Sequence, residues 1–146
     1  MQSAHEEFRD LAWKCGLAAT HQRQVIYEAV VAAPGHYSPE NIYADVRRKI
    51  PSISLATVYK NLRLFVQHGL LREVSPHAST LLVEGNLGVH HHLVCTRCKT
   101  VRDIIEDDFI NYNKLSRQAP RGFDLSDPLI EVFGLCKQCS AKAGAV

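Results

Sequence analysis

Three consecutive histidines stand directly before a pair of cysteines in HHHLVCTRC, residues 90–98 of the chain. Imidazole and thiolate are the most common zinc ligands in proteins, so this stretch indicates metal binding. Side chains alternate between the two faces of a β-strand, so His90 and His92 would point to one side of a strand and His91 to the other. We therefore expect two adjacent metal sites, one built on HxH and one on CxxC.

A second cysteine pair, CKQC, follows later in the chain. Two CxxC pairs around one small unit are a much more specific signal than one pair, because four thiolates form a tetrahedral zinc site. Such a closed coordination shell leaves no open position for catalysis, so we expect a structural ion that contributes on the order of 10 kcal/mol to folding. The predicted zinc ligands are Cys95, Cys98, Cys136 and Cys139.

The HxH pair needs ligands from outside its own strand. Candidates are His36 in a predicted loop, Glu84 in a predicted linker and Asp103 at the end of a predicted strand. Each also has an ordinary interpretation, as a loop residue, a solvated charge or a strand cap. Together with the histidines they would give a mixed nitrogen and oxygen set, which suits ferrous iron, manganese or zinc.

The composition limits which classes of protein could carry these sites. With 146 residues, 46% of them hydrophobic, the chain is typical of a globular protein of one or two small domains. No apolar run approaches the roughly 18 residues of a membrane span, and the first residues lack the apolar core of a signal peptide. We therefore expect a cytoplasmic protein with no membrane partner, whose cysteines bind metal instead of forming disulfides. A net charge of +2 is too small to indicate nucleic-acid binding, so that function must be argued from a motif.

Four short helices followed by a β-hairpin are predicted in residues 1–84. Apolar side chains recur at helical spacing, with caps such as Thr20, Ser38 and Ser54 before them and glycine or proline after them. The runs LLREV and TLLVE, joined by SPHAS, predict the two strands of the hairpin. This order is typical of a winged helix-turn-helix, which places one helix in the major groove of DNA. The polar face of the fourth predicted helix carries Thr57, Lys60, Asn61 and Arg63.

Glycine and asparagine in EGNLG, residues 84–88, indicate a linker. Beyond it the sequence predicts strands near 91–95, 100–105 and 129–135, a helix near 107–119 and a frayed tail at 141–146. The predicted fold class is therefore α+β. Its parts are a winged helix-turn-helix domain at residues 1–84, a linker at 85–88 and a small α/β unit at 89–146.

These motifs together resemble the ferric uptake regulator family of bacterial metal-dependent transcription factors, which work as dimers. THQR at residues 20–23 is similar to the family's TPQR, and ISLATVYKNLRLFVQHGLL at 53–71 is similar to its SxATVYRNLxxLxxxGL. HHHLVCTRC and CKQC complete the series, so the resemblance covers nearly the whole chain. Four matches in the same order are far more specific than any one of them.

The resemblance implies an N-terminal DNA-binding domain and a C-terminal dimerisation domain, with double-stranded operator DNA as the partner of a homodimer. It implies structural zinc on the four cysteines, and a regulatory Fe²⁺ or Mn²⁺, with Zn²⁺ as an alternative, on His36, Glu84, His90, His92 and Asp103. The recognition helix would lie at about residues 54–68, where Lys60 replaces the family's usual arginine by a point charge. The residues expected to contact DNA are Arg23, Ser54, Thr57, Tyr59, Lys60, Asn61 and Arg63.

A regulatory ion bound by all five ligands would link the two domains and select one conformation, so the expected function is repression of transcription with metal bound. Iron-uptake members tend to carry glutamate at both acidic positions and peroxide-sensing members aspartate, whereas this chain has Glu84 and Asp103. The signal is therefore left open between iron or manganese supply and peroxide, with a zinc-uptake regulator as the alternative.

Two other classes of function also fit part of the sequence. HxH with a carboxylate also occurs among the metal ligands of metal-dependent hydrolases, but neither HExxH nor a nucleophile motif is present. We therefore expect no enzyme and no small organic substrate. A zinc-stabilised interaction module would explain the cysteines but would leave the helix-turn-helix unexplained.

Overall fold

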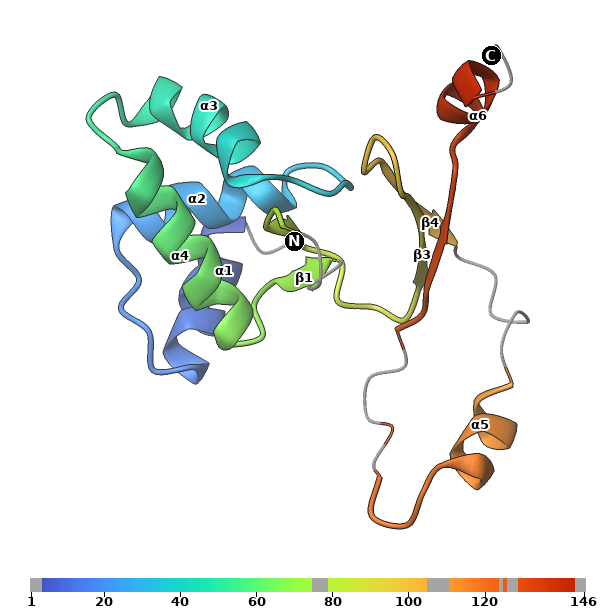
Figure 1. The fold of residues 1–146 in the computed structure, drawn as a ribbon. Coiled ribbons are helices and arrows are strands. Elements are labelled where there is room, and N and C mark those ends of the chain that lie inside the picture. Colours follow the sequence, from blue (N-terminus) through green and yellow to red (C-terminus); the bar gives the residue numbers. More distant parts are fainter. Residues whose placement is uncertain (1–3, 75–78, 105–110, 124, 126–128, 144–146) are drawn as a thin grey trace. The chain divides into compact units, whose positions relative to one another are not determined.

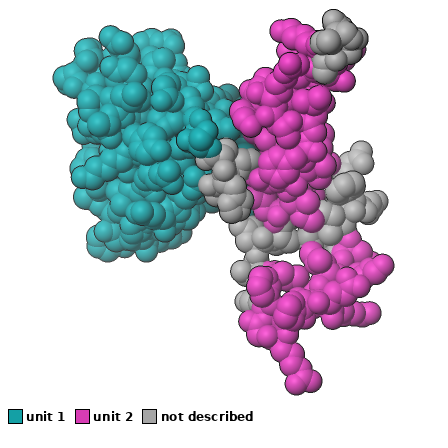
Figure 2. Space-filling model, in the orientation of Figure 1, with its two compact units in different colours: residues 1–87 teal, residues 88–146 magenta. Residues whose placement is uncertain are grey.

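The structure of the protein, a computed structural model, describes residues 4–74, 79–104, 111–123, 125 and 129–143. The chain divides into two compact units, Met1–Leu87 and Gly88–Val146, drawn in teal and magenta in Figure 2. Each unit contains its own β-sheet. Among the described residues, no helix combines the length and the hydropathy that crossing a membrane requires.

The first unit consists of helices followed by a small sheet (Figure 1). Its helices are α1 (Ala4–Lys14), α2 (His21–Val31), α3 (Pro39–Lys49) and α4 (Leu55–Gln67). Strand β1 (Arg72–Val74) pairs antiparallel with β2 (Leu82–Glu84). This is the predicted order of helices and hairpin, and it confirms the winged helix-turn-helix.

Side-chain caps explain where three of these helices begin. The hydroxyl of Thr20 accepts a hydrogen bond from the backbone N–H of Arg23, and Ser54 does the same for Thr57. At α3 the cap is reciprocal, because the amide oxygen of Asn41 also accepts from the N–H of Ser38 at 3.1 Å. Each cap satisfies a backbone donor that has no partner inside its helix, which is worth about 1 kcal/mol. A positive φ of 68° at Gly69 then lets the chain turn out of α4.

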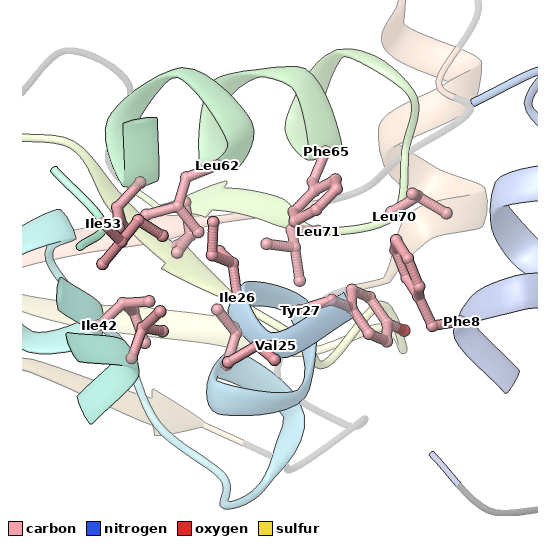
Figure 3. Close-up of a cluster of buried hydrophobic side chains, with 14 of the residues drawn as sticks. Phe8, Val25, Ile26, Tyr27, Ile42, Ile53, Leu62, Phe65, Leu70 and Leu71 are labelled. Atoms are coloured by element: carbon pink, nitrogen blue, oxygen red, sulfur yellow. The ribbon is translucent and has the colours of Figure 1, made fainter. Parts of the chain in front are cut away.

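An aromatic cluster forms the centre of the core that joins the helices (Figure 3). The ring of Phe8 lies 5.1 Å from that of Tyr27 and 5.8 Å from that of Phe65, measured between centroids. Leu62 is fully buried in the same core. Because α4 buries this face, its opposite face is fixed toward solvent.

The second unit contains a three-stranded sheet in the order β4-β3-β5. Strand β3 (His91–Cys95) pairs antiparallel with β4 (Val101–Ile104) and parallel with β5 (Glu131–Gly134). The helices of this unit are α5 (Tyr112–Gln118) and α6 (Lys137–Ala143). The α+β class is therefore confirmed for the chain as a whole.

The helical segments of the second unit differ from the prediction. Of the helix expected near 107–119, the structure describes 112–118 as helical, whereas 105–110 lie outside the described residues. The expected frayed tail at 141–146 is wrong for 141–143, which belong to α6, and 144–146 are not described. The run KQCSAKA has no apolar periodicity to reveal a helix. Its first turn is closed by a backbone hydrogen bond from the Ser140 N–H to the carbonyl of Cys136 at 2.8 Å.

Candidate functional site

The two cysteine pairs come together in the second unit. Cys95 ends β3, Cys98 lies in the turn after it, and Cys136 and Cys139 flank the start of α6. The four sulfur atoms lie within 4.8 Å of one another, and the Sγ atoms of Cys98 and Cys136 are 3.7 Å apart. A tetrahedral ion with bonds of about 2.3 Å separates its sulfur ligands by roughly 3.8 Å. The cluster therefore has the dimensions of a four-thiolate metal site.

The turn between β3 and β4 shapes the first cysteine pair. Cys95 N–H donates to the carbonyl of Thr100 at 2.9 Å, and Lys99 N–H donates back to the carbonyl of Cys95 at 3.0 Å. Lys99 adopts a left-handed conformation with φ 64°, and its ammonium donates to the carbonyl of Thr96 at 2.7 Å. These contacts hold the chain in the tight turn that brings the Cys98 thiol toward the Cys95 thiol.

The thiols of the cluster differ in acidity. Hydrogen bonds from the backbone N–H groups of Cys136 and then Cys98 lower the pKa of Cys95 to about 6. Burial, followed by hydrogen bonding to Cys136, raises the pKa of the Cys139 thiol to about 12. One thiolate therefore forms readily while another resists ionisation beside it. A bound divalent cation favours the ionised form of all four thiols and offsets part of the repulsion between them, so this donor set fits a metal ion.

A second cluster in the same unit is built from two histidines and a carboxylate. The Nε2 atoms of His90 and His92 lie 3.0 Å apart, and Asp103 Oδ1 lies 3.6 Å from His92 Nε2 and 4.0 Å from His90 Nε2. The carbonyl of Gly88 lies 2.8 Å from His90 Nδ1, a contact that fixes the ring with Nε2 facing the cluster. By contrast, His91 Nδ1 accepts from the backbone N–H of Ile130 at 3.3 Å. The predicted separation of His91 from its two neighbours is therefore observed.

The remaining two predicted regulatory ligands lie together in the first unit. His36 Nε2 is 3.4 Å from Glu84 Oε2, and Arg72 Nη1 is 3.6 Å from Glu84 Oε1. An isolated bridge between Tyr37 and Val83, with both backbone hydrogen bonds at 2.9 Å, holds the two segments side by side. Each unit thus brings its own predicted ligands together, His36 with Glu84 in the first unit and His90 with His92 and Asp103 in the second.

The amino-terminal end of α4 has the properties of an anion-binding helix end. Ser54 and Thr57 lie there with their hydroxyl oxygens 2.9 Å apart, and the first turn contains no acidic residue. No carboxylate of this first turn therefore offsets the partial positive charge of the helix terminus. Tyr59, Lys60 and Arg63 are exposed on the helix that follows.

The polarity of Asn61 predicts the exposed face of α4, but the residue lies on the buried face. Its side chain is 9% exposed, because it follows Val58 by three positions and precedes Phe65 by four on the buried side of the helix. Its Nδ2 donates to the carbonyl of Thr57 at 2.8 Å, and its Oδ1 accepts from Arg23 Nε at 3.2 Å. The expectation of an exposed Asn61 is therefore wrong, whereas its involvement in DNA binding stays a prediction.

One contact network on α4 was not predicted from the sequence. Arg63 Nη2 donates to the hydroxyl of Tyr59 at 3.3 Å, and Arg63 Nη1 lies 3.4 Å from a carboxylate oxygen of Glu73 on β1. The hydrogen bond to Tyr59 is the largest cause of a raised Arg63 pKa, which burial opposes and Glu73 supports. The spacing of Tyr59 and Arg63 is visible in the sequence. The approach of Glu73 depends on how the hairpin of β1 and β2 packs against α4.

The model of the Ferric uptake regulator family matches residues 14–133. The peroxide-responsive repressor PerR of Staphylococcus epidermidis is 30% identical over 126 residues, which cover 86% of this chain and 83% of that protein. The structure of the Helicobacter pylori ferric uptake regulator has a TM-score of 0.76 at 22% identity, covering 94% of this chain and 91% of that one. The corresponding Vibrio cholerae structure has a TM-score of 0.71 at 26% identity, covering 88% and 99%.

Proposed function

Because the chain belongs to the ferric uptake regulator family of metal-dependent transcription regulators, we propose that it is a cytoplasmic repressor that binds operator DNA as a homodimer when a regulatory metal is bound. The observation that carries this proposal is the combination, in one chain, of a winged helix-turn-helix with two separate sets of metal-binding side chains. Members of the family are regulators and not enzymes, so the hydrolase alternative is set aside.

The ion at the four cysteines is proposed to be Zn²⁺ with a structural role. Supporting this, the sulfur atoms lie close enough for tetrahedral binding, and zinc prefers thiolate ligands. The ligands come from two segments that are 38 positions apart at Cys98 and Cys136. Zinc would therefore hold the β3-β4 turn against the start of α6.

The regulatory ion is proposed to bind His36, Glu84, His90, His92 and Asp103. Support comes from the two groups already formed, each of which presents imidazole nitrogen next to carboxylate oxygen. Such a set suits Fe²⁺ or Mn²⁺, with Zn²⁺ as a weaker candidate. Ligands from both units would bind the same ion, so metal would favour the one arrangement of the units that fits DNA.

DNA is proposed to bind the exposed face of α4 and its amino-terminal end. Tyr59 would contact bases, while Lys60 and the helix terminus would contact phosphates. Arg23 is proposed to contact the backbone beside them, held in place by Asn61. Two copies are needed to read two half-sites, and the second unit exposes apolar side chains suited to an interface between copies, among them Leu93, Val132 and Phe133.

Peroxide response is a second candidate function. It is favoured by the 30% identity to the Staphylococcus epidermidis peroxide-responsive repressor. Asp103 fits that branch, whereas Glu84 fits the iron-uptake branch, so the acidic ligands favour neither branch over the other. The proposed regulatory metal therefore stays Fe²⁺ or Mn²⁺, and oxidation of its ligands is tested separately.

The test is DNA binding by the full chain under controlled metal loading. DNA ligands are first selected from a random-sequence pool in the presence of Mn²⁺, and their affinity is then measured by fluorescence anisotropy with Mn²⁺, anaerobic Fe²⁺, Zn²⁺ or chelator. We expect at least about a tenfold tightening with the regulatory metal, within the usual range of coupling between two sites. Equal affinity in all four conditions would contradict metal control, and failure to enrich any DNA would contradict the repressor itself.

A further inference from the structure

We infer that Arg63 and Glu73 are positioning residues that hold Tyr59 in the orientation needed to read DNA, and that Arg63 is not itself a phosphate contact. This inference rests on the proposed DNA-binding role of α4. It changes the expectation from the sequence, where Arg63 appeared as one more cation on the helix surface.

The guanidinium of Arg63 bridges its two partners with its two terminal nitrogens. Nη2 donates to the Tyr59 hydroxyl at 3.3 Å, while Nη1 lies 3.4 and 3.5 Å from the two carboxylate oxygens of Glu73. The Arg63 Cζ also lies over the Tyr59 ring, 5.6 Å from its centroid. The planar fork of arginine suits this double role, which the single ammonium of lysine does not reproduce.

The electrostatics of this network disfavour a direct phosphate contact. Glu73 neutralises the charge of Arg63, so the pair offers DNA almost no net positive charge. By comparison, Lys60 is exposed on the same helix and has no such acidic partner among the described contacts. Counterion release from DNA therefore depends on Lys60 more than on Arg63.

The contact with Arg63 restricts the orientation of the Tyr59 ring before DNA binds. Its side chain is 39% exposed, and the guanidinium of Arg63 lies over its ring. Ordering a mobile side chain during binding lowers the affinity, and a side chain that is already ordered avoids this loss. Arg63 connects the ring to β1 through Glu73, so β1 and α4 together set the position of the Tyr59 hydroxyl.

The first experiment compares Arg63→Ala, Arg63→Lys and Glu73→Gln with the parent chain, using the selected DNA and a random duplex over a series of salt concentrations. We expect Arg63→Ala to lower the affinity for selected DNA about tenfold, which is the loss typical of one base contact. The affinity for random DNA should fall less than about twofold. Arg63→Lys should behave like Arg63→Ala, because it keeps the charge and loses the fork. Glu73→Gln removes a negative charge, so random DNA should bind more tightly while the preference for selected DNA falls.

Arg48→Ala is the matched control, because Arg48 is an exposed arginine on α3 whose acidic partner, Asp45, lies 2.6 Å away on the same helix. It should leave the preference for selected DNA unchanged. A salt slope that falls by about one unit in Arg63→Ala, with equal losses on both DNAs, would instead identify Arg63 as a phosphate contact and overturn the inference. Parent-like behaviour of Arg63→Lys would overturn it as well.

A double-mutant cycle tests whether Arg63 acts through Tyr59. If it does, Arg63→Ala costs about tenfold in the parent chain and less than about twofold when Tyr59 is already alanine, because contacting residues are not additive. Equal costs in both backgrounds would refute the proposed route. The χ1 coupling constants of Tyr59, measured by NMR without DNA, provide an independent readout.

In the parent chain we expect a single Tyr59 rotamer, and in Arg63→Ala an average over several. One fixed rotamer in both proteins would contradict the positioning role. This measurement also separates the two proposals. A parent chain that binds no DNA removes the proposed function, whereas the rotamers of Tyr59 still decide whether Arg63 and Glu73 hold the ring.

Discussion

His92 lies directly opposite Asp103 in the antiparallel pairing of β3 with β4, and its Nε2 is 3.6 Å from Asp103 Oδ1. Directly opposed residues in such a ladder place their side chains on the same face of the sheet. The strand register therefore brings an imidazole and a carboxylate together without any contribution from loops. A slip of one residue would turn one of the two to the other face and destroy the cluster.

Replacing His92 tests the regulatory site. His92→Ala should reduce affinity for Mn²⁺ by at least about 10- to 100-fold, because loss of even an outer partner of a metal ligand has effects of this size. Metal-dependent DNA binding should disappear, while zinc at the cysteines is retained. Calorimetric titration with Mn²⁺ and elemental analysis measure the two effects.

His91→Ala is the control for this variant. His91 is adjacent in sequence, but its Nδ1 accepts a hydrogen bond from the backbone N–H of Ile130 at 3.3 Å. It should keep the Mn²⁺ affinity of the parent chain. Equal losses in the two variants would mean that the strand, and not the ligand, is responsible.

Replacing a cysteine of the cluster should remove the structural metal. Cys136→Ser should abolish the one zinc per chain and cooperative unfolding of the second unit, because the ion supplies on the order of 10 kcal/mol of folding free energy. Elemental analysis and thermal denaturation followed by circular dichroism provide the measurements. Cys15→Ser is the matched control, since Cys15 lies on the first unit and its Sγ donates to the carbonyl of His68 at 3.6 Å. Full zinc content in Cys136→Ser would contradict the four-thiolate site.

Removing the charge of Lys60 should mainly affect the sequence-independent part of DNA binding. Lys60→Ala should lower the slope of log affinity against log salt by about one unit, on selected and random DNA alike. Lys114, exposed on α5 of the second unit, gives the control substitution, and Lys114→Ala should leave the slope unchanged. An unchanged slope in Lys60→Ala would place this lysine away from the phosphates.

Peroxide treatment distinguishes an oxidant sensor from a reversible iron sensor. If the iron-loaded protein senses peroxide, we expect the gain of one oxygen on the peptide that contains His36 or on the one that contains His90 and His92. Oxidised imidazole is a poorer ligand, so the regulatory metal and DNA affinity should be lost together. Mass spectrometry of the iron and manganese forms, treated in parallel, provides the measurement. Unmodified peptides in the iron form would identify a repressor that responds to iron supply alone.

Local signals explain what could be predicted from the sequence. The helices α2 to α4 are delimited by caps and by glycine or proline, which act within a few residues, and the CxxC pairs act within a single turn. The polarity of Asn61 predicts exposure, but helical phase puts the residue beside Val58 and Phe65 on the buried face of α4. The contact between Arg63 and Glu73 joins a helix to a strand and depends on tertiary packing. Helix α6 was not expected because KQCSAKA has no apolar periodicity.

The separation of 38 positions between Cys98 and Cys136 has a consequence for how this unit tolerates insertion and deletion. A metal that joins the two cysteine pairs closes a long loop, and the entropy of closing a flexible loop grows only with the logarithm of its length. Doubling this separation of 38 positions would therefore cost only about 0.6 kcal/mol in closure entropy. The two-residue spacers inside CTRC and CKQC would tolerate no such change, because each would set the distance between two sulfur ligands of one ion.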